Sequence, residues 1–583
     1  MARRAKSLQS RRAGKTRRKG PAKAGATPLE APWIAHYPPG VSWDAPLKPM
    51  SLPAMFDAAA RDFAGLIATD FLGARLTYGE LAGITERVAA GLQASGIGRG
   101  HRIGLFLPNT PYYVAAYFAL LKTGATVVNF NPLYTIEELK EQARDAGIIA
   151  MVTLDLKVLF DKVAALAASG LIDRVVVCPF ADILPVVTRF LFRLFKSGEL
   201  ANPAASPVAA MVLDWRVLAA HAGKLSGVII KPDDIALLQY TGGTTGEPKG
   251  AMLSHANLTI NVQQIEAWCP GMIARGQERI MAILPFFHVF AMTTVMNFAV
   301  HAGAAMILLP RFDVRQAVKT MRRARPTIMP AVPTLFTALL NFKGIARQDL
   351  ASLKFCISGG APLPQVVRAS FEELAGCRVV EGYGLSETSP VATCNPFEGL
   401  RKVNSIGQPC PGTDVSIRAL DDPETVMAPG EAGEICIKGP QVMKGYWNRP
   451  DATAEAFIGD YFRTGDVGHM DSDGFIFIID RIKDMINCSG FKVYPRRIEE
   501  AIHSHPAVAE VTVIGVPDPY RGEAPKAFIK LKDGARASEA DILDHLEDKL
   551  SRIEMPAKIE FRDELPKTMV GKLSKKDLRD GAG

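Results

Sequence analysis

YTGGTTGEPKG, at residues 240–250, holds four glycines, three threonines and one lysine in eleven residues. It follows the apolar run DIALLQYT (234–241), which is typical of a buried strand. Glycines let backbone amides approach a phosphate closely, threonine hydroxyls bind phosphate oxygens or a metal, and lysine supplies positive charge. The segment lacks the Gly-Lys-Ser/Thr order of a Walker loop. The composition therefore predicts a different kind of phosphate-binding loop directly after a buried strand.

Apolar strand-like runs and helical patterns alternate on both sides of this segment. A helical pattern covers 112–122, and the strand-like runs HRIGLFL, TVVNFN, DRVVVCPF and LKFCISGG lie at 101–107, 126–131, 173–180 and 353–360. Strands that alternate with helices indicate an α/β fold with largely parallel sheets. We therefore expect one large α/β domain with parallel-rich sheets and helices around the glycine-rich loop.

The pattern changes near Asp480. Downstream, residues 509–518 and 526–534 are typical of short alternating strands, and 539–551 of a helix, which indicates a small α+β domain. The expected organisation is a basic disordered tail and linker, a large N-terminal domain and a small C-terminal cap domain, over residues 1–45, 46–480 and 481–583.

The net charge of +8 belongs to the N-terminal tail. Ten of the 68 basic residues lie between Met1 and Gly25, and no acidic residue precedes Glu30. Without these ten, 58 basic residues face 60 acidic ones, so the body is close to neutral. The body gives no reason to expect nucleic-acid binding. Its 48% hydrophobic and 22% charged residues are typical of a globular protein.

The cysteines and the N-terminal tail bear on the cellular compartment. The eight cysteines include no Cys-x-x-Cys pair, so neither a zinc site nor a redox dithiol is expected. Scattered single cysteines suit a reducing compartment, and we expect a cytoplasmic protein. No apolar core follows the basic run, which argues against a secretory signal. A transit peptide, a solvated tail and a contact with anionic lipid on the inner face of the membrane stay open.

Two further stretches are apolar enough to raise the question of a membrane. Residues 280–310 contain no Asp, Glu, Lys or Arg, but they hold proline, histidines and other polar residues, so we expect a buried core segment. Residues 182–196, DILPVVTRFLFRLFK, are too short to span a bilayer. Arg189 and Arg193 share one helix face there. This segment could lie in a membrane interface or pack on the protein with its arginines in solvent.

Five ordered segments together resemble the adenylate-forming superfamily of acyl-CoA synthetases, luciferases and adenylation domains. They are YTGGTTGEPKG (240–250), EGYGLSE (381–387), YFRTGD (461–466), DRIKDMINCSGFKVYP (480–495) and LPKTMVGK (565–572). The resemblance covers about residues 50–580. Through NPLYT (131–135) and LPFFHVF (284–290), the chain is most similar to bacterial long-chain fatty-acid–CoA ligases.

The resemblance implies a two-step reaction. A carboxylate attacks the α-phosphate of ATP to give an acyl-adenylate and pyrophosphate, and the thiol of coenzyme A then attacks the adenylate. Charge builds up on the phosphates, so Mg²⁺ and a lysine must be directed there. The implied substrates are a fatty acid, ATP and coenzyme A. A ligase for aryl or medium-chain acids, and one that passes its adenylate to a carrier protein, stay open as alternatives.

Four residues carry the chemistry that the resemblance implies. Glu387 and Thr244 would bind Mg²⁺, for which oxygen ligands are suited. Lys572 would reach the α-phosphate and the substrate carboxylate, and its spacing from LPK (565–567) selects it among neighbouring lysines. His288 would flank the acyl entrance. Considered singly, Glu387 could be a helix-capping acid and His288 a buried core histidine, but the ordered motifs favour the functional interpretation.

The nucleotide and coenzyme contacts follow from the same resemblance. Tyr383 is expected to stack on adenine, and Asp466, which alone could be a turn residue, to accept hydrogen bonds from the ribose hydroxyls with help from Arg481. The full implied set is Thr241, Gly242, Gly243, Thr244, Thr245, Gly246, Lys249, Gly359, Gly360, Ala361, Glu381, Gly382, Tyr383, Gly384, Ser386, Asp466, Ile478, Arg481, Ser489, Gly490 and Phe491.

Between the two steps the C-terminal domain is implied to rotate about a hinge at Asp480 and Arg481. Rotation would bring the segment 489–491 to the pantetheine thiol. One departure from the family pattern is Arg497, where relatives usually carry an acid two residues after the proline of VYP. A non-catalytic nucleotide-binding or membrane-scaffold protein is the alternative class. The assembly is open, with a homodimer as one option.

Overall fold

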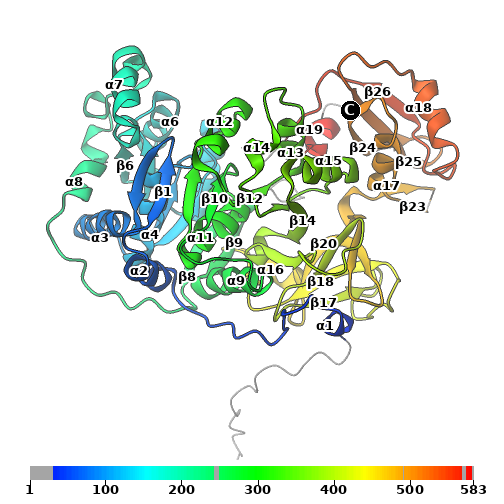
Figure 1. Cartoon of the computed structure of the whole chain (residues 1–583), viewed down its shortest axis with the longest axis horizontal. Coiled ribbons are helices and arrows are strands. Elements are labelled where there is room, and N and C mark those ends of the chain that lie inside the picture. Colours follow the sequence, from blue (N-terminus) through cyan, green and yellow to red (C-terminus); the bar gives the residue numbers. More distant parts are fainter. Residues whose placement is uncertain (1–30, 242–247, 490, 568–572, 581–583) are drawn as a thin grey trace, which may run out of the picture. The chain divides into compact units, whose positions relative to one another are not determined.

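The computed structural model describes residues 31–241, 248–489, 491–567 and 573–580. These residues form three sheets with helices packed on them (Figure 1). Strands and helices alternate along the first two sheets, and most neighbouring strands of the first are parallel. The predicted α/β class with parallel-rich sheets is therefore confirmed.

The first sheet has seven strands in the order β7-β6-β5-β3-β4-β8-β9. All neighbouring pairs are parallel except the last, β8 and β9, which is antiparallel. In chain order the strands are β3 (Arg102–Leu105), β4 (Thr126–Asn129), β5 (Ala150–Leu154), β6 (Arg174–Cys178), β7 (Val212–Asp214), β8 (Ile235–Thr241) and β9 (Lys249–Ser254). The strands expected around 101–107, 126–131, 173–180 and 234–241 are all present.

The second sheet is parallel from β14 to β1 and antiparallel from β14 to β17, and β2 pairs antiparallel with β1 at the other edge. Its order is β17-β18-β20-β21-β16-β15-β14-β13-β12-β10-β11-β1-β2, and β19 pairs with β20. The strands are β1 (Ile67–Phe71), β2 (Ala74–Thr77), β10 (Arg279–Ala282), β11 (Ala305–Leu308), β12 (Ile328–Ala331), β13 (Phe355–Ser358), β14 (Arg378–Gly384), β15 (Val391–Cys394), β16 (Ser405–Pro409), β17 (Asp414–Arg418), β18 (Gly433–Lys438), β19 (Phe457–Ile458), β20 (Tyr461–Met470) and β21 (Ile476–Arg481).

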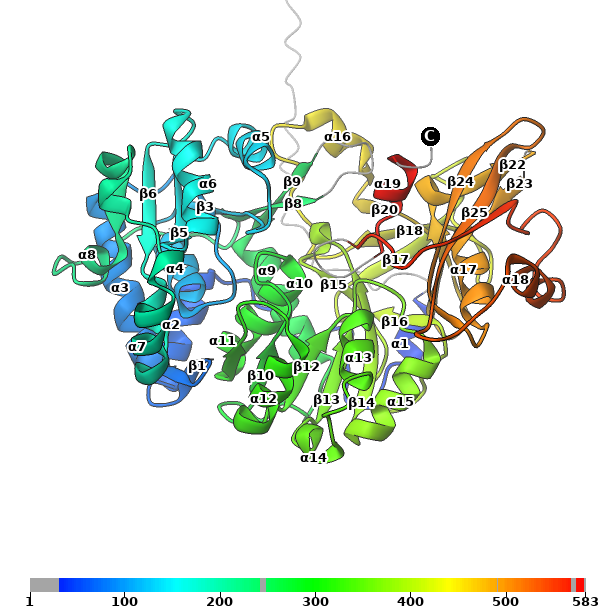
Figure 2. The same ribbon diagram turned by 90° about the horizontal axis from the view of Figure 1, so that it is seen from above.

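The helices on these sheets begin and end where the sequence supplies caps. Helix α4 (Pro111–Lys122) starts with proline, which has no amide hydrogen to leave unpaired, and the Thr110 hydroxyl caps it by accepting from the Tyr113 amide. The remaining principal helices are α2 (Leu52–Asp62), α3 (Tyr78–Ala94), α5 (Ile136–Ala146), α6 (Lys157–Ala168), α9 (His255–Ala267), α12 (Val314–Ala324), α13 (Pro333–Leu340) and α15 (Gln365–Ala375). Figure 2 shows α4 and α6 beside the first sheet, whose strands both helices contact.

The uncharged stretch 280–310 is a core segment, as predicted. It contains β10, the short helices α10 (Val289–Ala291) and α11 (Phe298–Ala302), and β11, and residues 292–297 between the two helices form a buried π-helix. The stretch lies on the sheet rather than in lipid because β10 and β11 are neighbouring strands. None of the described helices is both long enough and apolar enough to cross a membrane.

The third sheet belongs to the segment after Asp480. Its strands are β22 (Ile486–Cys488), β23 (Phe491–Val493), β24 (Val508–Asp518), β25 (Gly522–Leu531) and β26 (Lys558–Phe561). Helices α17 (Pro495–His503) and α18 (Glu539–Leu546) accompany it, and α19 (Lys575–Asp580) follows β26 in the chain. A separate apolar cluster forms its core, including Ile498, Val513 and Ile542. The predicted small α+β unit is present.

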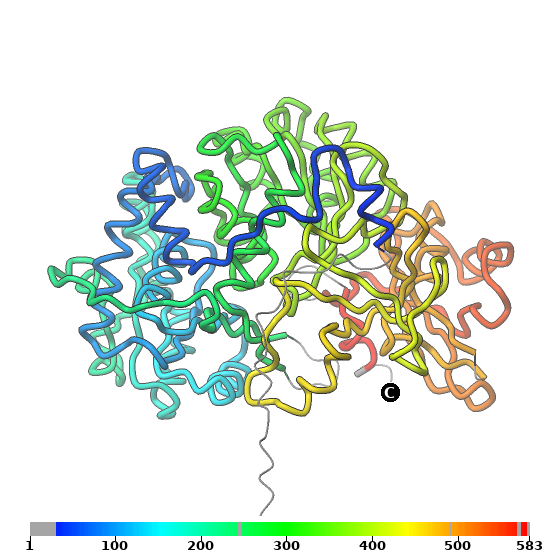
Figure 3. Tube along the Cα trace, turned by 90° about the horizontal axis from the view of Figure 1, so that it is seen from below, coloured from blue at the N-terminus to red at the C-terminus, as the bar shows by residue number. Residues whose placement is uncertain are grey.

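Residues 32–45 differ from the unpacked linker that the sequence suggested. The short helix α1 (Pro32–Ala35) buries Trp33, the Tyr37 hydroxyl donates to the carbonyl of Pro409 at 2.6 Å, and the Trp43 indole donates to that of Thr413 at 3.2 Å. Figure 3 shows this segment as a dark blue tube across the face seen from below. Three aromatic side chains therefore hold the segment to the second sheet. The sequence did not indicate this packing, because the segment is rich in proline.

Candidate nucleotide and acyl site

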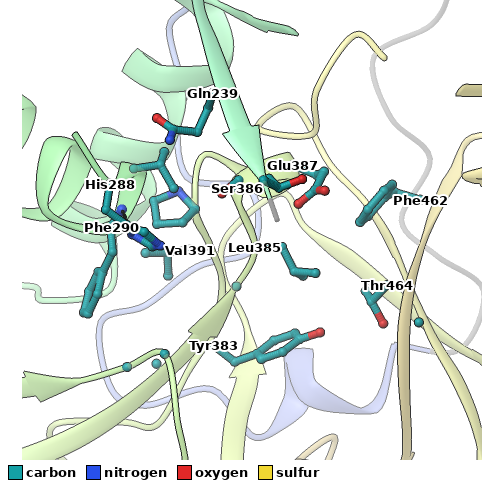
Figure 4. Close-up of a pocket in the computed structure, with 18 of the residues that line it drawn as sticks. Gln239, His288, Phe290, Tyr383, Leu385, Ser386, Glu387, Val391, Phe462 and Thr464 are labelled. Atoms are coloured by element: carbon teal, nitrogen blue, oxygen red, sulfur yellow. Dashed lines mark hydrogen bonds between the residues drawn. The ribbon is translucent and has the colours of Figure 1, made fainter. Parts of the chain in front are cut away.

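A cavity of about 850 Å³ lies where β8, β14 and β21 end and β20 begins. Figure 4 shows part of its lining, with Gln239 and His288 on one side, Thr464 on the other, and Glu387 between them. The predicted site residues that line this cavity are Thr241, Lys249, His288, Gly359, Gly360, Gly382, Tyr383, Gly384, Ser386, Glu387 and Arg481. Segments more than two hundred residues apart therefore meet around one space.

Tyr383, Asp466 and Arg481 form a hydrogen-bonded group from three strands. The Tyr383 hydroxyl donates to Asp466 Oδ2 at 2.6 Å, and Arg481 Nε lies 3.1 Å from Asp466 Oδ1. The contact arises because Asp466 and Arg481 are directly opposite each other on the antiparallel pair β20–β21. Burial raises the pKa of Tyr383 well above its usual value. The pKa of Arg481 is also raised, mainly by the negative charge of Asp466. A neutral phenol and an ion pair are thus held beside the cavity.

Glu387 is a buried carboxylate in the turn Ser386–Thr388 that follows β14. Its Oε1 atom accepts a hydrogen bond from the Tyr446 hydroxyl at 2.8 Å, and its backbone carbonyl accepts from the amide of Met443. Burial is the main reason why the pKa of Glu387 is raised. A cation nearby would stabilise the ionised form, so this oxygen donor suits a hard metal ion.

Gly384 allows the turn that carries Glu387 to fold back on itself. A Cβ atom at this position would lie 1.7 Å from the carbonyl oxygen of Pro390. No side chain fits at that distance, so glycine is required by close backbone approach. Gly382, two residues earlier, is not crowded, because its nearest neighbour would be 3.7 Å away.

His288 caps the short helix α10, and its Nδ1 atom accepts from the Phe290 amide at 3.3 Å. Its ring also lines the cavity, so it is neither a purely internal core histidine nor remote from the site. Gln239 lies near it on β8, where its Nε2 atom donates to the carbonyl of Phe287 and its Oε1 atom accepts from Asn129. The hydrogen bond from Gln239 to Phe287 thereby links strand β8 to the residues just before α10 at the cavity wall.

Several lining residues were not predicted from the sequence. Lys483 and Tyr446 stand in no glycine-rich motif, and Gln239 looks like a strand residue. Burial, and secondarily Arg481, lower the pKa of Lys483. Lys249 Nζ lies 5.5 Å from the centroid of the Tyr446 ring. The available signal for Lys483 was its place in the hinge motif, two residues after Asp480–Arg481.

One part of the cavity wall is apolar. It contains Ile265, Trp268, Val391 and Phe397, together with the thiols of Cys269, Cys394 and Cys410. Burial, followed by the neighbouring Cys394 and Cys269, raises the pKa of Cys410, so these thiols are neutral near pH 7. Trp268 is held from behind by an edge contact with Tyr37, with ring centroids 5.4 Å apart. The anchored segment 32–45 therefore supports the apolar wall.

Asp480 connects the two sides of the expected hinge. Its Oδ1 atom accepts from the Arg481 amide at 2.7 Å and its Oδ2 atom from the Arg496 amide, at the start of α17, at 2.8 Å. Glu499, on the same helix, pairs with Lys575 at 2.9 Å. Arg497, the departure from the family pattern, instead pairs with Glu554 at 3.0 Å. The acid two residues further on thus contacts Lys575, and Arg497 has a partner elsewhere.

Other predicted residues do not line the cavity. Ala361, Glu381, Asp466, Ile478, Ser489 and Phe491 are absent from its lining, although Asp466 reaches Tyr383 and Arg481 beside it. Glu381 Oε2 accepts from the Leu363 amide at 3.2 Å, and Phe491 is exposed. Gly242, Gly243, Thr244, Thr245, Gly246, Gly490 and Lys572 lie outside the described residues. Their roles stay predictions.

Comparison with known proteins gives the class. The family model described as AMP-binding enzyme matches residues 56–447, and that of the AMP-binding enzyme C-terminal domain matches 497–572. The chain is 40% identical to a long-chain-fatty-acid–CoA ligase of Bacillus subtilis, over 94% of this chain and 98% of that one. The chain therefore belongs to the AMP-binding enzyme family.

Solved structures agree with this assignment. ATP-bound MatB from Rhodopseudomonas palustris is similar with a TM-score of 0.79 and 30% identity, covering 91% of this chain and 99% of that one. A second similar structure is O-succinylbenzoate coenzyme A synthetase from Bacillus subtilis, in complex with ATP and magnesium ion. Its TM-score is 0.75 and its identity 26%, and the match covers 90% of this chain and 99% of that one. A large N-terminal domain with a smaller C-terminal one is thus shared.

Proposed function

We propose that the chain activates a long-chain fatty acid with ATP and transfers it to coenzyme A, releasing AMP and pyrophosphate. The observation that carries the proposal is that one cavity has both a polar and an apolar part of its wall. One part offers Lys249, Glu387 and Arg481, which suit a triphosphate and its ribose. Another offers Trp268 and its apolar neighbours, which suit an alkyl chain. The long-chain-fatty-acid–CoA ligase of Bacillus subtilis supports the same substrate class.

Each group in the polar part has a task in nucleotide binding. The Tyr383 ring offers a face for adenine, and Asp466, held by Arg481, is a carboxylate that accepts from ribose hydroxyls. Glu387 would bind Mg²⁺ together with Thr244; the ion supplies charge neutralisation at the phosphates. One or two protein carboxylates suffice for Mg²⁺ that is also bound by phosphate oxygens. Lys483 adds a positive charge at the same wall.

The apolar part of the cavity orients the acid. Each buried CH₂ contributes about 0.8 kcal/mol, so a chain in contact with Trp268 and its neighbours gains affinity with length. His288 and Gln239 line the same cavity, on the side opposite Thr464, and we assign them to the approach of the carboxylate to the α-phosphate. Lys572 is assigned to that phosphate and carboxylate in the first step. A rotation at Asp480 would then replace it by the segment 489–491 for the thiol step.

The test measures pyrophosphate release and thioester formation separately, for acids from C4 to C20, with and without coenzyme A. We expect both products, with efficiency rising towards long chains. Efficiency that peaks at aryl or medium-chain acids would replace the substrate class. Pyrophosphate release without thioester would overturn coenzyme A as acceptor, and would favour a carrier protein.

The proposal includes the place of the enzyme in the cell. We place it in the cytoplasm, with peripheral contact to the anionic inner face of the membrane, because ten cations precede Gly25 and each contributes about 1 kcal/mol near such a surface. Deleting residues 1–25 should weaken sedimentation with anionic vesicles at low salt and leave turnover of a soluble acid unchanged. Unaltered sedimentation would remove the tail from the proposal. A homodimer stays open, and sedimentation velocity decides it.

A further inference from the structure

Helix α7 (Val186–Phe195) exposes nearly all of its apolar side chains. None of its ten residues is buried. The exposed fractions are 80% for Val186, 71% for Val187, 67% for Phe190, 46% for Leu191, 59% for Leu194 and 76% for Phe195. An isolated exposed apolar residue is ordinary, but six on one short helix mark an interaction surface.

These six side chains occupy one side of the helix. With 3.6 residues per turn, their positions span about half of its circumference, and Arg189 and Phe192 fall on the other half. Phe192 packs edge-on against Phe180, with centroids 5.3 Å apart, and Arg189 donates to the carbonyl oxygen of Asp182 at 2.5 Å. The arginine thus faces the protein, and the apolar half faces outward. This excludes the option of a helix packed on the protein with both arginines in solvent.

The outward orientation is fixed by contacts to the body. Asp182 Oδ1 pairs with Arg193 of α7 at 2.8 Å, and Asp182 Oδ2 pairs with Arg216 of α8 (Trp215–Ala219) at 2.8 Å. The next residue on α8, Val217, is also exposed. In Figure 1, α7 lies at the edge of the drawn chain. Rotation of α7 to hide its apolar half would break the Arg193–Asp182 ion pair, the Arg189 hydrogen bond and the contact between Phe192 and Phe180.

We infer that α7 inserts this apolar half into the interface of a lipid bilayer. The outward half of α7 is a convex ridge about 15 Å long with six apolar side chains, whereas each partner of a stable protein–protein interface supplies about 20–30 residues. A bilayer needs no such complementary area, because its acyl chains adapt to a convex ridge. The helix is too short to span, which requires about 20 residues. It therefore lies in the interface plane.

The charges at the rim suit lipid headgroups. Arg193 and Lys196, at the end of the helix, have side-chain exposures of 54% and 58%. Cations beside an apolar face contact the phosphates while the apolar side chains enter the acyl boundary. This inference rests on the proposed function in one respect: a long-chain acid partitions into bilayers, so an enzyme seated there meets its substrate. The geometry of α7 does not depend on it.

The experiment uses the full chain and vesicles without nucleotide. The test variant is Phe190→Ser/Leu194→Ser/Phe195→Ser. The matched control is Ile229→Ser/Val366→Ser/Tyr520→Ser, three exposed apolar residues elsewhere, at 82%, 77% and 92% exposure. Flotation is measured with pure phosphatidylcholine vesicles and with 30% phosphatidylglycerol, at low and at high salt. High salt screens contacts of the basic tail but not apolar insertion.

We expect the parent chain and the control to float with both kinds of vesicle at high salt, and the α7 variant to bind at least tenfold more weakly. Equal flotation of the variant and the parent would overturn the inference. So would a loss of oligomeric mass in the variant without vesicles, which would assign the face to a second copy of the chain. Pyrophosphate release with octanoate should be unchanged in both variants. If the parent chain releases pyrophosphate neither with octanoate nor with any longer acid up to C20, the proposed function fails while the flotation result stands.

Discussion

The strands around Tyr383 and the segment after Asp480 are held together in different ways. In the first region Asp466 is buried, hydrogen-bonded to Tyr383 at 2.6 Å and opposed to Arg481 across a strand pair. In the second, an apolar cluster forms the core, and ion pairs around it have a solvent-exposed arginine, such as Arg579–Asp484 at 2.8 Å and Arg497–Glu554 at 3.0 Å. Buried hydrogen bonds preserve one geometry, whereas exposed ion pairs cost little to exchange. The second kind of contact suits a segment that is proposed to move.

The largest effect is expected from a change in the segment after Asp480 that slows one of the two chemical steps and spares the other. Lys572→Ala should slow adenylate formation about 10³-fold, or about 4 kcal/mol, because the charge on the α-phosphate is no longer offset. Thioester formation from a supplied acyl-adenylate should persist. Pyrophosphate release and thioester formation measure the two steps, with Lys576→Ala, at an exposed neighbouring lysine, as control. Equal loss in both steps would refute the assigned role.

The second prediction breaks the region around Tyr383. Gly384→Ala should lower the free energy of unfolding by about 3 kcal/mol, because the added Cβ atom would lie 1.7 Å from the Pro390 carbonyl oxygen and the backbone must shift. Urea denaturation measures the change. Gly382→Ala is the stability control, since its Cβ atom would meet nothing closer than 3.7 Å. Similar losses in both variants would show that the close approach is not the cause.

The third prediction concerns the acid side of the stability profile of the large region. His255, at the start of α9, is 2% exposed, and burial lowers its pKa to about 4 from an ordinary 6.5. The unfolded chain therefore binds the proton more readily, and stability falls as the pH drops from 6.5 towards 4. Between pH 7.5 and 5 this histidine should account for about 2 kcal/mol of that loss.

His255→Asn removes the titration and offers another acceptor for the Leu52 amide, which now donates to His255 Nδ1 at 3.2 Å. Urea denaturation of the variant at pH 7.5 and pH 5 should show a smaller difference than in the parent chain. The carboxylates titrate in both proteins, so the difference between them isolates the histidine. An unchanged pH dependence would contradict the prediction.

The smallest effect is expected in the segment after Asp480. Arg497→Ala removes one ion pair with Glu554 in which the arginine side chain is 63% exposed, so the cost in stability should stay below about 1 kcal/mol. Thioester formation should be unchanged, because Glu499 rather than Arg497 contacts Lys575. If thioester formation alone fell strongly, Arg497 would instead have a role in the rotated state of the C-terminal domain.

Part of the candidate site could be predicted because its chemistry is written in short segments. The glycine-rich loop, the turn with Glu387 and the pair Asp480–Arg481 are each recognisable from adjacent residues. Gln239 and Tyr446 were missed because they line the cavity only through the strand order and loop path, whereas Lys483 stood within the hinge motif and was not singled out. Trp268 was missed for the same reason, since its place in the apolar wall depends on Tyr37, more than two hundred residues away.

The sequence by itself determined the α/β class, the small domain after Asp480 and the order of the nucleotide motifs. Local periodicity and turn composition encode such features. Tertiary structure alone decided that Asp466 meets Tyr383 and Arg481, that residues 32–45 support the cavity wall, and that α7 turns its apolar half outward. Periodicity shows that a helix has two faces, but which face is covered depends on the distant side chains packed against it.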